Sequence, residues 1–177
     1  MLDIEKRAER FARNHHGLAG QSRKYTREPY INHPAAVVKL VRSVPHTAAM
    51  LAASWLHDVV EDTEASLDQV TRELGNDVAQ LVAMLTSVSR PEDGNRGKRK
   101  EIDNAHLAKA SPDAKTIKLA DIIDNSKSIV ERDPKFASYY IEEKLTQIQV
   151  LKEGNTTLWE MAYKTLLESR NRLQELK

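Results

Sequence analysis

The segment WLHDVVEDT, residues 55–63, concentrates side chains that could bind a metal ion and transfer protons. His57 and Asp58 follow the most apolar run of the chain, where an unpaired carboxylate would be costly to bury. A divalent cation would relieve that cost, but adjacent helical residues diverge by about 100°, so further ligands must come from elsewhere. Glu61 and Asp62 lie four residues further on, on the same side of the helix or at its frayed end. One imidazole and three carboxylates so close together predict a site for metal binding and proton transfer.

A simpler interpretation of this segment is a capped helix end, in which the acids are solvated and His57 bonds to a backbone carbonyl. A bare His-Asp pair would fit that description. The additional acids and the apolar approach favour the metal site.

Two other segments could complete the ligand set. His33, in EPYINHP, is held by Pro34 at the start of a helix. Asp121 interrupts the apolar part of KLADIIDNSKS, residues 118–128. Two imidazoles and two carboxylates suit Mn²⁺ or a similar octahedral ion that keeps water in its open positions. Taken alone, His33 would be interpreted as a packed loop histidine.

Asp121 belongs to a polar stripe on one face of the helix expected over residues 118–128. The stripe consists of side chains three or four positions apart: Lys118, Asp121, Asn125 and Ser128. On an otherwise apolar helix such a stripe needs partners. The alternative for Asp121 is a buried salt bridge, for example to Arg23 or Lys24.

Apolar residues recur at spacings of three and four along the chain without strand-like alternation, which predicts an all-α protein of about eight or nine helices. The stretch from Thr47 to Val60 is apolar nearly all round and is expected to be a central helix. Residues 90–100, rich in charge and glycine, are predicted to form a mobile loop. Helix starts are expected at capping residues, namely Ser66 with Gln69, Asn76, Ser111, Asp133, and Thr157 with Glu160. Gly75 is expected to end the helix that Ser66 opens.

The bulk properties fit one domain spanning residues 1–177. A net charge of +1 argues against a general nucleic-acid or membrane surface, although it permits a local basic pocket. The absence of cysteine removes disulfides, thiolate zinc sites and a cysteine nucleophile. The charged N-terminus does not read as a signal peptide, so a cytoplasmic protein is expected. A homodimer is compatible with the sequence.

The motifs REPYINHP, WLHDVVEDT and KLADIIDN, in that order, resemble those of the HD-domain hydrolases of the RelA/SpoT family, in particular the small single-domain alarmone hydrolases such as the metazoan SpoT homologues. The resemblance extends from about residue 4 to about residue 150, including the segments between the motifs. It implies an HD-domain helical bundle of about eight to ten helices. The implied activity is the Mn²⁺-dependent removal of the 3′-pyrophosphate from guanosine tetra- or pentaphosphate.

The resemblance also implies roles for individual residues. The implied metal ligands are His33, His57, Asp58 and Asp121. The implied water-activating residues are Glu61 and Asp62, and which of them is the base is left open. The implied nucleotide contacts are Arg23, Lys24, Asn125 and Ser128. Lys24, Lys118 and the run 98–100 are candidate phosphate partners, although the run is more simply interpreted as a solvated loop.

Two positions depart from the family pattern. Arg27 stands where glycine is frequent, and Asp124 stands where an aromatic residue or histidine is frequent. Both are expected near the nucleotide and not near the metal, so they leave the identity of the substrate more open than the type of reaction. An HD-type phosphohydrolase acting on another nucleotide such as NADPH is therefore the nearest alternative. A nucleotide-binding sensor without turnover is disfavoured because Glu61 and Asp62 are both present, and a helical interaction module is disfavoured by the polar stripe.

Overall fold

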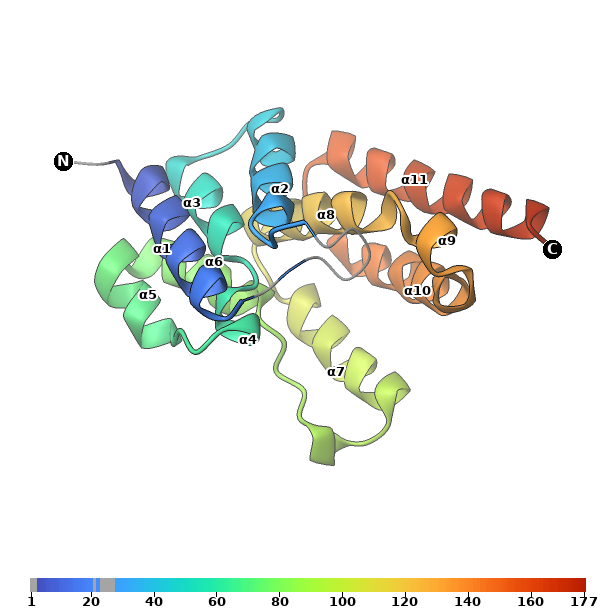
Figure 1. Cartoon of the computed structure of the whole chain (residues 1–177), viewed down its shortest axis with the longest axis horizontal. Helices are drawn as coiled ribbons and strands as arrows, with labels where there is room; N and C mark the ends of the chain where they lie inside the picture. The colour runs from blue at the N-terminus through green and yellow to red at the C-terminus, as the bar shows by residue number, and fades with distance from the viewer. Residues whose placement is uncertain (1–2, 21, 23–27) are drawn as a thin grey trace.

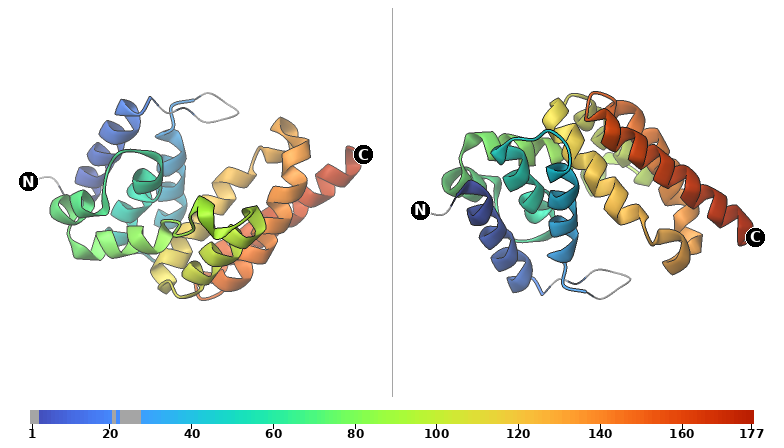
Figure 2. Two further views of the ribbon diagram at one scale, coloured as in Figure 1. Left: turned by 90° about the horizontal axis from the view of Figure 1, so that it is seen from below. Right: turned by 90° about the horizontal axis from the view of Figure 1, so that it is seen from above.

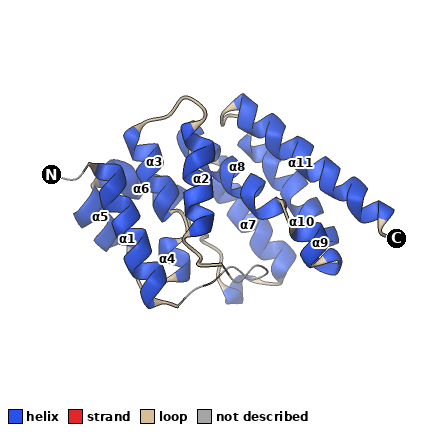
Figure 3. Cartoon of the chain, turned by 45° about the horizontal axis from the view of Figure 1, so that its top comes forward, coloured by secondary structure: helices blue, strands red, loops and turns tan. Residues whose placement is uncertain are grey.

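The computed structural model describes residues 3–20, 22 and 28–177, and this part of the chain is almost entirely helical (Figure 3). Its α-helices are α1 (Ile4–Leu18), α2 (Asn32–Arg42), α3 (Ala48–Leu56), α4 (Val59–Asp62), α5 (Leu67–Leu74), α6 (Asn76–Leu85), α7 (Arg96–Ala108), α8 (Pro112–Ser126), α9 (Ile129–Arg132), α10 (Pro134–Gln147) and α11 (Thr156–Glu175). Short 3-10 segments cover Pro91–Asp93 and Ile148–Leu151. The predicted all-α class is confirmed. The expected count matches the longer helices, since only α4 and α9 are as short as four residues.

The helices form two groups that lie side by side along the long axis of the molecule (Figures 1 and 2). Helices α1 to α6 make up one end and α9 to α11 the other, while α7 projects from the body in Figure 1. Helix α8 joins the groups because it packs against α2, α3 and α6 on one side and against α11 on the other. Side chains of α8 can therefore contact both groups of helices.

Helix α3 lies at the centre of the first group, as its apolar sequence predicts. Every residue from Met50 to Leu56 is buried, and the helix packs against α1, α2, α6 and α8. The prediction that it continues to Val60 is wrong. Its last helical residue is Leu56, and a turn at residues 57 and 58 precedes the four-residue α4. The carbonyl of Ser54, which a continued helix would use, accepts a hydrogen bond of 2.8 Å from Nδ1 of His57.

Several predicted helix boundaries are confirmed. Ser66 and Gln69 form the expected capping box, and Gly75 ends α5 with a φ of 93°, a conformation that favours glycine. Ser111 caps α8 and Asp133 caps α10, in each case through the side-chain oxygen and with proline as the first helical residue.

Other predicted boundaries are wrong. Asn76 is the first residue of α6 and not its cap. Helix α11 begins before Thr157, because the side chain of Asn155 accepts a hydrogen bond from the Leu158 N–H.

The predicted loop over residues 90–100 is also wrong from Arg96 onward. Asn95 caps α7 by accepting a hydrogen bond from the Lys98 N–H, so the basic run is helical. The guanidinium of Arg96 forms an ion pair with Glu143 of α10, at 2.8 Å between Nε and Oε1. Most of α7 is charged and at least partly exposed, and Leu107 is its one buried residue, so the helix lacks the regular apolar spacing by which the other helices are predicted.

Within the described residues, no helix combines the length and apolar character needed to cross a bilayer.

Candidate metal centre

The four predicted metal ligands converge in the structure from three elements. His33 lies in the first turn of α2, His57 and Asp58 form the turn between α3 and α4, and Asp121 lies in the middle of α8. His33 Nε2 is 2.9 Å from Asp121 Oδ1 and 3.2 Å from His57 Nε2. His57 Nε2 is 3.1 Å from Asp58 Oδ2 and 3.4 Å from Asp121 Oδ1. One ligand atom from each residue lies within 4.8 Å of all the others.

These spacings fit a divalent cation. Ligand bonds of about 2.1 Å place neighbouring ligand atoms about 3.0 Å apart in an octahedron and about 3.4 Å apart in a tetrahedron. The separation between His33 Nε2 and Asp58 Oδ2 is larger, at 3.8 Å, and still fits inside such a shell. Two imidazoles and two carboxylates are also the donor types that Mn²⁺ and related ions accept.

The break in the helix explains how neighbouring residues can serve one ion. Asp58 has φ −108° and ψ 0°, away from regular helical values. On a continuous helix its side chain would diverge from that of His57 by about 100°. The turn instead brings His57 Nε2 and Asp58 Oδ2 to 3.1 Å.

The two imidazoles face each other in a way that requires a positive charge between them. His57 Nδ1 contacts the Ser54 carbonyl oxygen, which can only accept a hydrogen bond, so Nδ1 carries the proton. His33 Nδ1 lies 2.7 Å from a carboxylate oxygen of Asp124 and carries its proton for the same reason. Both neutral rings then direct the Nε2 lone pair towards the same point, where a proton or a cation must separate them.

The charges around this point are strongly coupled. Burial opposes protonation of His57, but Asp58 and Asp121 outweigh it and raise the His57 pKa well above its usual value. Burial likewise opposes ionisation of Asp121, yet Lys118 and the two imidazoles hold its pKa well below the usual range. His57 lowers the pKa of Asp58 to about 2 against the effect of burial. Both carboxylates therefore stay ionised at neutral pH, and the cluster attracts a cation.

Tyr30 is a functional neighbour that sequence reasoning missed. Its phenolic hydroxyl donates a hydrogen bond to Asp58 Oδ2. Burial and the adjacent Asp58 carboxylate raise the Tyr30 pKa, which keeps the hydroxyl protonated as a donor. Its position three residues before His33, at the mouth of the same helix, was the available signal.

Glu61 and Asp62, the two predicted catalytic acids, both lie on α4 but face different surroundings. Glu61 lines the same pocket as His57 and Asp58, and its Oε1 accepts a hydrogen bond from the backbone N–H of Ser87. Asp62 lines a separate depression with His15 and Gln69. Burial and the charges of Asp58 and Glu61 raise the Asp62 pKa to about 6.

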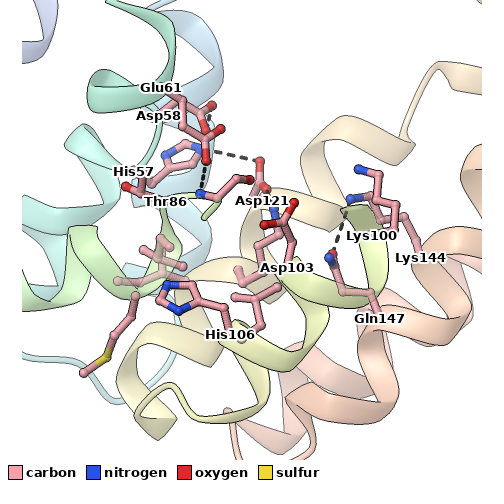
Figure 4. Close-up of a pocket in the computed structure, with 16 residues that line it drawn as sticks. His57, Asp58, Glu61, Thr86, Lys100, Asp103, His106, Asp121, Lys144 and Gln147 are labelled. Atoms are coloured by element: carbon pink, nitrogen blue, oxygen red, sulfur yellow. Dashed lines mark hydrogen bonds and ion pairs between the residues drawn. The ribbon is translucent and has the colours of Figure 1, made fainter. Parts of the chain in front are cut away.

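The pocket beside the ligand cluster has a basic wall (Figure 4). The space between its walls, counted together with the open solvent at its mouth, is about 570 Å³. Figure 4 shows Lys100 of α7 and Lys144 of α10 next to each other, with Asp121 between them and the turn that carries His57. Lys118, the third lysine of the pocket, forms an ion pair of 2.8 Å with Asp121.

Lys144 has an unusual environment for an ammonium group. Its Nζ lies 3.3 Å from Oε1 of Gln147 and 5.5 Å from the centre of the Tyr140 ring. Among the described residues no carboxylate forms an ion pair with it. Burial and the nearby charges of Lys118 and Lys100 lower the Lys144 pKa to about 7. From the sequence alone, Lys100 is expected in a solvated loop and Lys144 is not singled out.

The remaining predicted nucleotide contacts are only partly placed. Asn125 donates a hydrogen bond of 2.9 Å to Asp121 Oδ1, and Ser128 lies at the N-terminus of α9. Arg23 and Lys24, like Arg27, lie outside the described residues. Asp124, which is expected near the nucleotide, contacts Nδ1 of His33 with its carboxylate, on the side of the ring away from the cluster.

Comparison with known families decides the classification. A family model described as HD domain matches residues 8–148, which include all four converging ligands. The chain belongs to the HD-domain family. The predicted family resemblance is thereby confirmed, as is the helical bundle that it implied.

Relatives of this HD domain include named hydrolases. The mouse guanosine-3′,5′-bis(diphosphate) 3′-pyrophosphohydrolase MESH1 is 34% identical over 151 residues, covering 80% of this chain and 81% of the mouse protein. A solved structure described as a metazoan ortholog of SpoT that hydrolyses ppGpp superposes with a TM-score of 0.82, at 28% sequence identity. That match covers 95% of this chain and 96% of the other.

Some relatives are much longer than this HD domain. A probable guanosine-3′,5′-bis(diphosphate) 3′-pyrophosphohydrolase of Synechocystis is 45% identical over 73 residues. The matched region is 41% of this chain and only 10% of that protein.

Proposed function

We propose that this protein is a metal-dependent hydrolase that removes the 3′-pyrophosphate of guanosine tetra- or pentaphosphate, releasing pyrophosphate and GDP or GTP. The observation that carries the proposal is one pocket lined on one side by three members of the four-ligand cluster, His57, Asp58 and Asp121, and on the other by three lysines. The lysines can bind the phosphates of a polyanion, and the ligand cluster can hold the cation that promotes its hydrolysis. The names of the mouse and Synechocystis relatives support the guanosine substrate.

In this proposal His33, His57, Asp58 and Asp121 hold Mn²⁺ or a similar divalent cation. When bound, such an ion supplies the Lewis acidity that makes a water nucleophilic near neutral pH and neutralises phosphoryl oxygens. Glu61 is the acid that faces the reacting group, since it lines the same pocket as the ligands. The Ser87 N–H fixes one oxygen of its carboxylate, and the carboxylate can accept the proton of the attacking water. A bond forms between the water oxygen and phosphorus as the bond between phosphorus and the 3′-oxygen breaks, and the 3′-oxygen takes up a proton, balancing the one lost by the water, to leave as the hydroxyl of GDP or GTP.

A substrate panel tests the proposed function. The protein is stripped with a chelator, reloaded separately with Mn²⁺, Mg²⁺ or Zn²⁺, and incubated with guanosine tetraphosphate, GTP or NADPH. We expect GDP and pyrophosphate in equal amounts from guanosine tetraphosphate, with no turnover before metal is restored. Preferential release of inorganic phosphate from NADPH would move the function to the dinucleotide alternative. Binding without turnover, measured by calorimetry, would make the protein a sensor.

Lys144 is proposed to hold a phosphate of the substrate. Replacing Lys144 with Met should raise KM for guanosine tetraphosphate about 10- to 100-fold, because a hydrogen bond to a charged group contributes about 1.5–3 kcal/mol. The value of kcat should change much less. Lys164→Met, which removes an exposed lysine from α11, is the control for loss of charge alone. Equal KM values for the two variants would contradict the assignment.

The same lysine predicts a pH dependence of substrate binding. Burial and the charges of Lys118 and Lys100 lower the Lys144 pKa to about 7, although the carboxylates of Asp121 and Glu143 act in the opposite direction and raise it. The ammonium form binds phosphate, so KM should rise as the pH increases above about 7 and the free enzyme loses this proton. Lys144→Arg stays charged throughout the range. The ratio of wild-type KM to Arg-variant KM should therefore increase with pH, and this ratio cancels the titration of the substrate itself. A ratio independent of pH would refute the prediction.

Other expectations stay predictions from the sequence. They are the single-domain organisation over residues 1–177, the nucleotide contacts of Arg23, Lys24, Asn125 and Ser128, a cytoplasmic location, a homodimer and the absence of nucleic-acid partners.

A further inference from the structure

Two aspartates on α8 hold the His33 ring from opposite sides. Asp121 contacts Nε2 at 2.9 Å, and Asp124, one helical turn further on, contacts Nδ1 at 2.7 Å. His33 is 1% exposed and Asp124 is 6% exposed, so this contact is shielded from water. The spacing of three residues places both carboxylates along the same face of the helix, matching the two nitrogens of one imidazole.

The contact on Nδ1 determines which nitrogen can bind a cation. A carboxylate only accepts hydrogen bonds, so Asp124 requires the proton on Nδ1 and leaves Nε2 with its lone pair. His57 reaches the same form through the neutral carbonyl of Ser54. The two imidazoles thus differ in their outer partner. A charged partner on Nδ1 makes Nε2 of the ring a stronger electron-pair donor to a metal ion than a neutral carbonyl does.

The surface ion pair with Lys127 explains the presence of a buried carboxylate at position 124 less well than the contact with His33 does. Lys127 Nζ lies 3.8 Å from Asp124 Oδ1, and the Lys127 side chain is 61% exposed. An exposed pair at that distance contributes little to stability. Burying a carboxylate is costly, and the contact of 2.7 Å with His33 helps to offset that cost.

We propose that Asp124 is a positioning residue of the metal centre, whose carboxylate fixes the His33 ring with Nε2 directed at the cation. The inference rests on the proposed function only in requiring that the cluster binds a divalent ion. It assigns to Asp124 a role in metal affinity, whereas the family resemblance implies no role for an aspartate at this position.

Metal titration of the stripped protein tests this role. Calorimetry with Mn²⁺ should show affinity about 10- to 100-fold weaker in Asp124→Asn than in the wild type, which is typical of losing such an outer partner. Turnover should recover when the Mn²⁺ concentration is raised, a rescue that a merely structural defect would not show. Lys127→Met, which removes the surface partner of the same carboxylate, should leave the affinity unchanged.

The outcomes separate the inference from the proposed function. If the wild type binds no divalent ion, the metal centre itself fails. If the wild type binds Mn²⁺ and Asp124→Asn binds it equally well, the role of Asp124 is overturned while the metal centre stands. Should the variant not fold, the wild-type protein loaded with diamagnetic Zn²⁺ gives a direct readout. Nitrogen-15 spectra of His33 should show the proton on Nδ1, and a proton on Nε2 would overturn the inference.

Discussion

Replacing Asp58 with Asn is expected to abolish phosphate release while leaving the helical fold intact. The substitution keeps the size of the side chain and an oxygen that can accept a hydrogen bond from the Tyr30 hydroxyl, but it removes one of the two negative charges of the four-ligand cluster. A neutral amide is a much poorer ligand for a hard divalent cation. Turnover of guanosine tetraphosphate should therefore fall to the background rate at every Mn²⁺ concentration tested.

Thermal unfolding gives a second measurement of the same loss. A ligand that binds only the folded protein stabilises it by about 2.7 kcal/mol at one hundred times its Kd. The wild-type Tm should therefore rise on addition of Mn²⁺, and this rise should disappear in Asp58→Asn. Asp68→Asn removes a charge from the exposed face of α5 and should behave as the wild type. Near-normal turnover in Asp58→Asn would remove Asp58 from the ligand set.

Replacing Glu61 with Gln should slow the chemical step by about a hundredfold or more, the usual size of a general acid–base contribution. The amide oxygen of glutamine can still accept the Ser87 N–H, so the side chain should keep its place in the pocket. Metal affinity and KM should change little. Single-turnover rates, measured with substrate and Mn²⁺ at saturation, isolate this step from binding and product release.

Asp62→Asn is the matched comparison, because both acids lie on the same four-residue helix and face different surroundings. We expect the larger loss of rate in the Glu61 variant. A larger loss in Asp62→Asn would transfer the role of base to Asp62. Loss of Mn²⁺ from Glu61→Gln would instead make Glu61 a ligand.

The candidate ligand set could be proposed from sequence because residue type, local pattern and family resemblance all point to it, and the structure brings its four members together. His33, His57, Asp58 and Asp121 are ligand-forming residues placed at helix starts or within apolar helices, where their burial needs a reason. The turn at His57-Asp58 could not be predicted from the same pattern. Periodicity continues through it, and only the hydrogen bond from His57 to the Ser54 carbonyl reveals the break.

The basic wall was harder to predict because it depends on tertiary packing. Lys100 and Lys144 come from different helices, and each lies among charged residues that read as solvent-facing. A weak signal existed in α10, where Tyr140, Lys144 and Gln147 recur at helical spacing on a mostly buried face. The contact of Asp124 with His33 could not be predicted for a related reason, since the two residues are 91 positions apart in the chain.

The division of the pocket between two groups of helices has an evolutionary consequence. The candidate ligands other than Asp121 belong to the group from α1 to α6, whereas Lys100 and Lys144 belong to α7 and α10. Substitutions in α7 and α10 can therefore alter which phosphorylated compound is held without touching the groups that cleave it. Under the proposed function, a fold arranged in this way would let substrate preference diverge without a change in the hydrolytic chemistry.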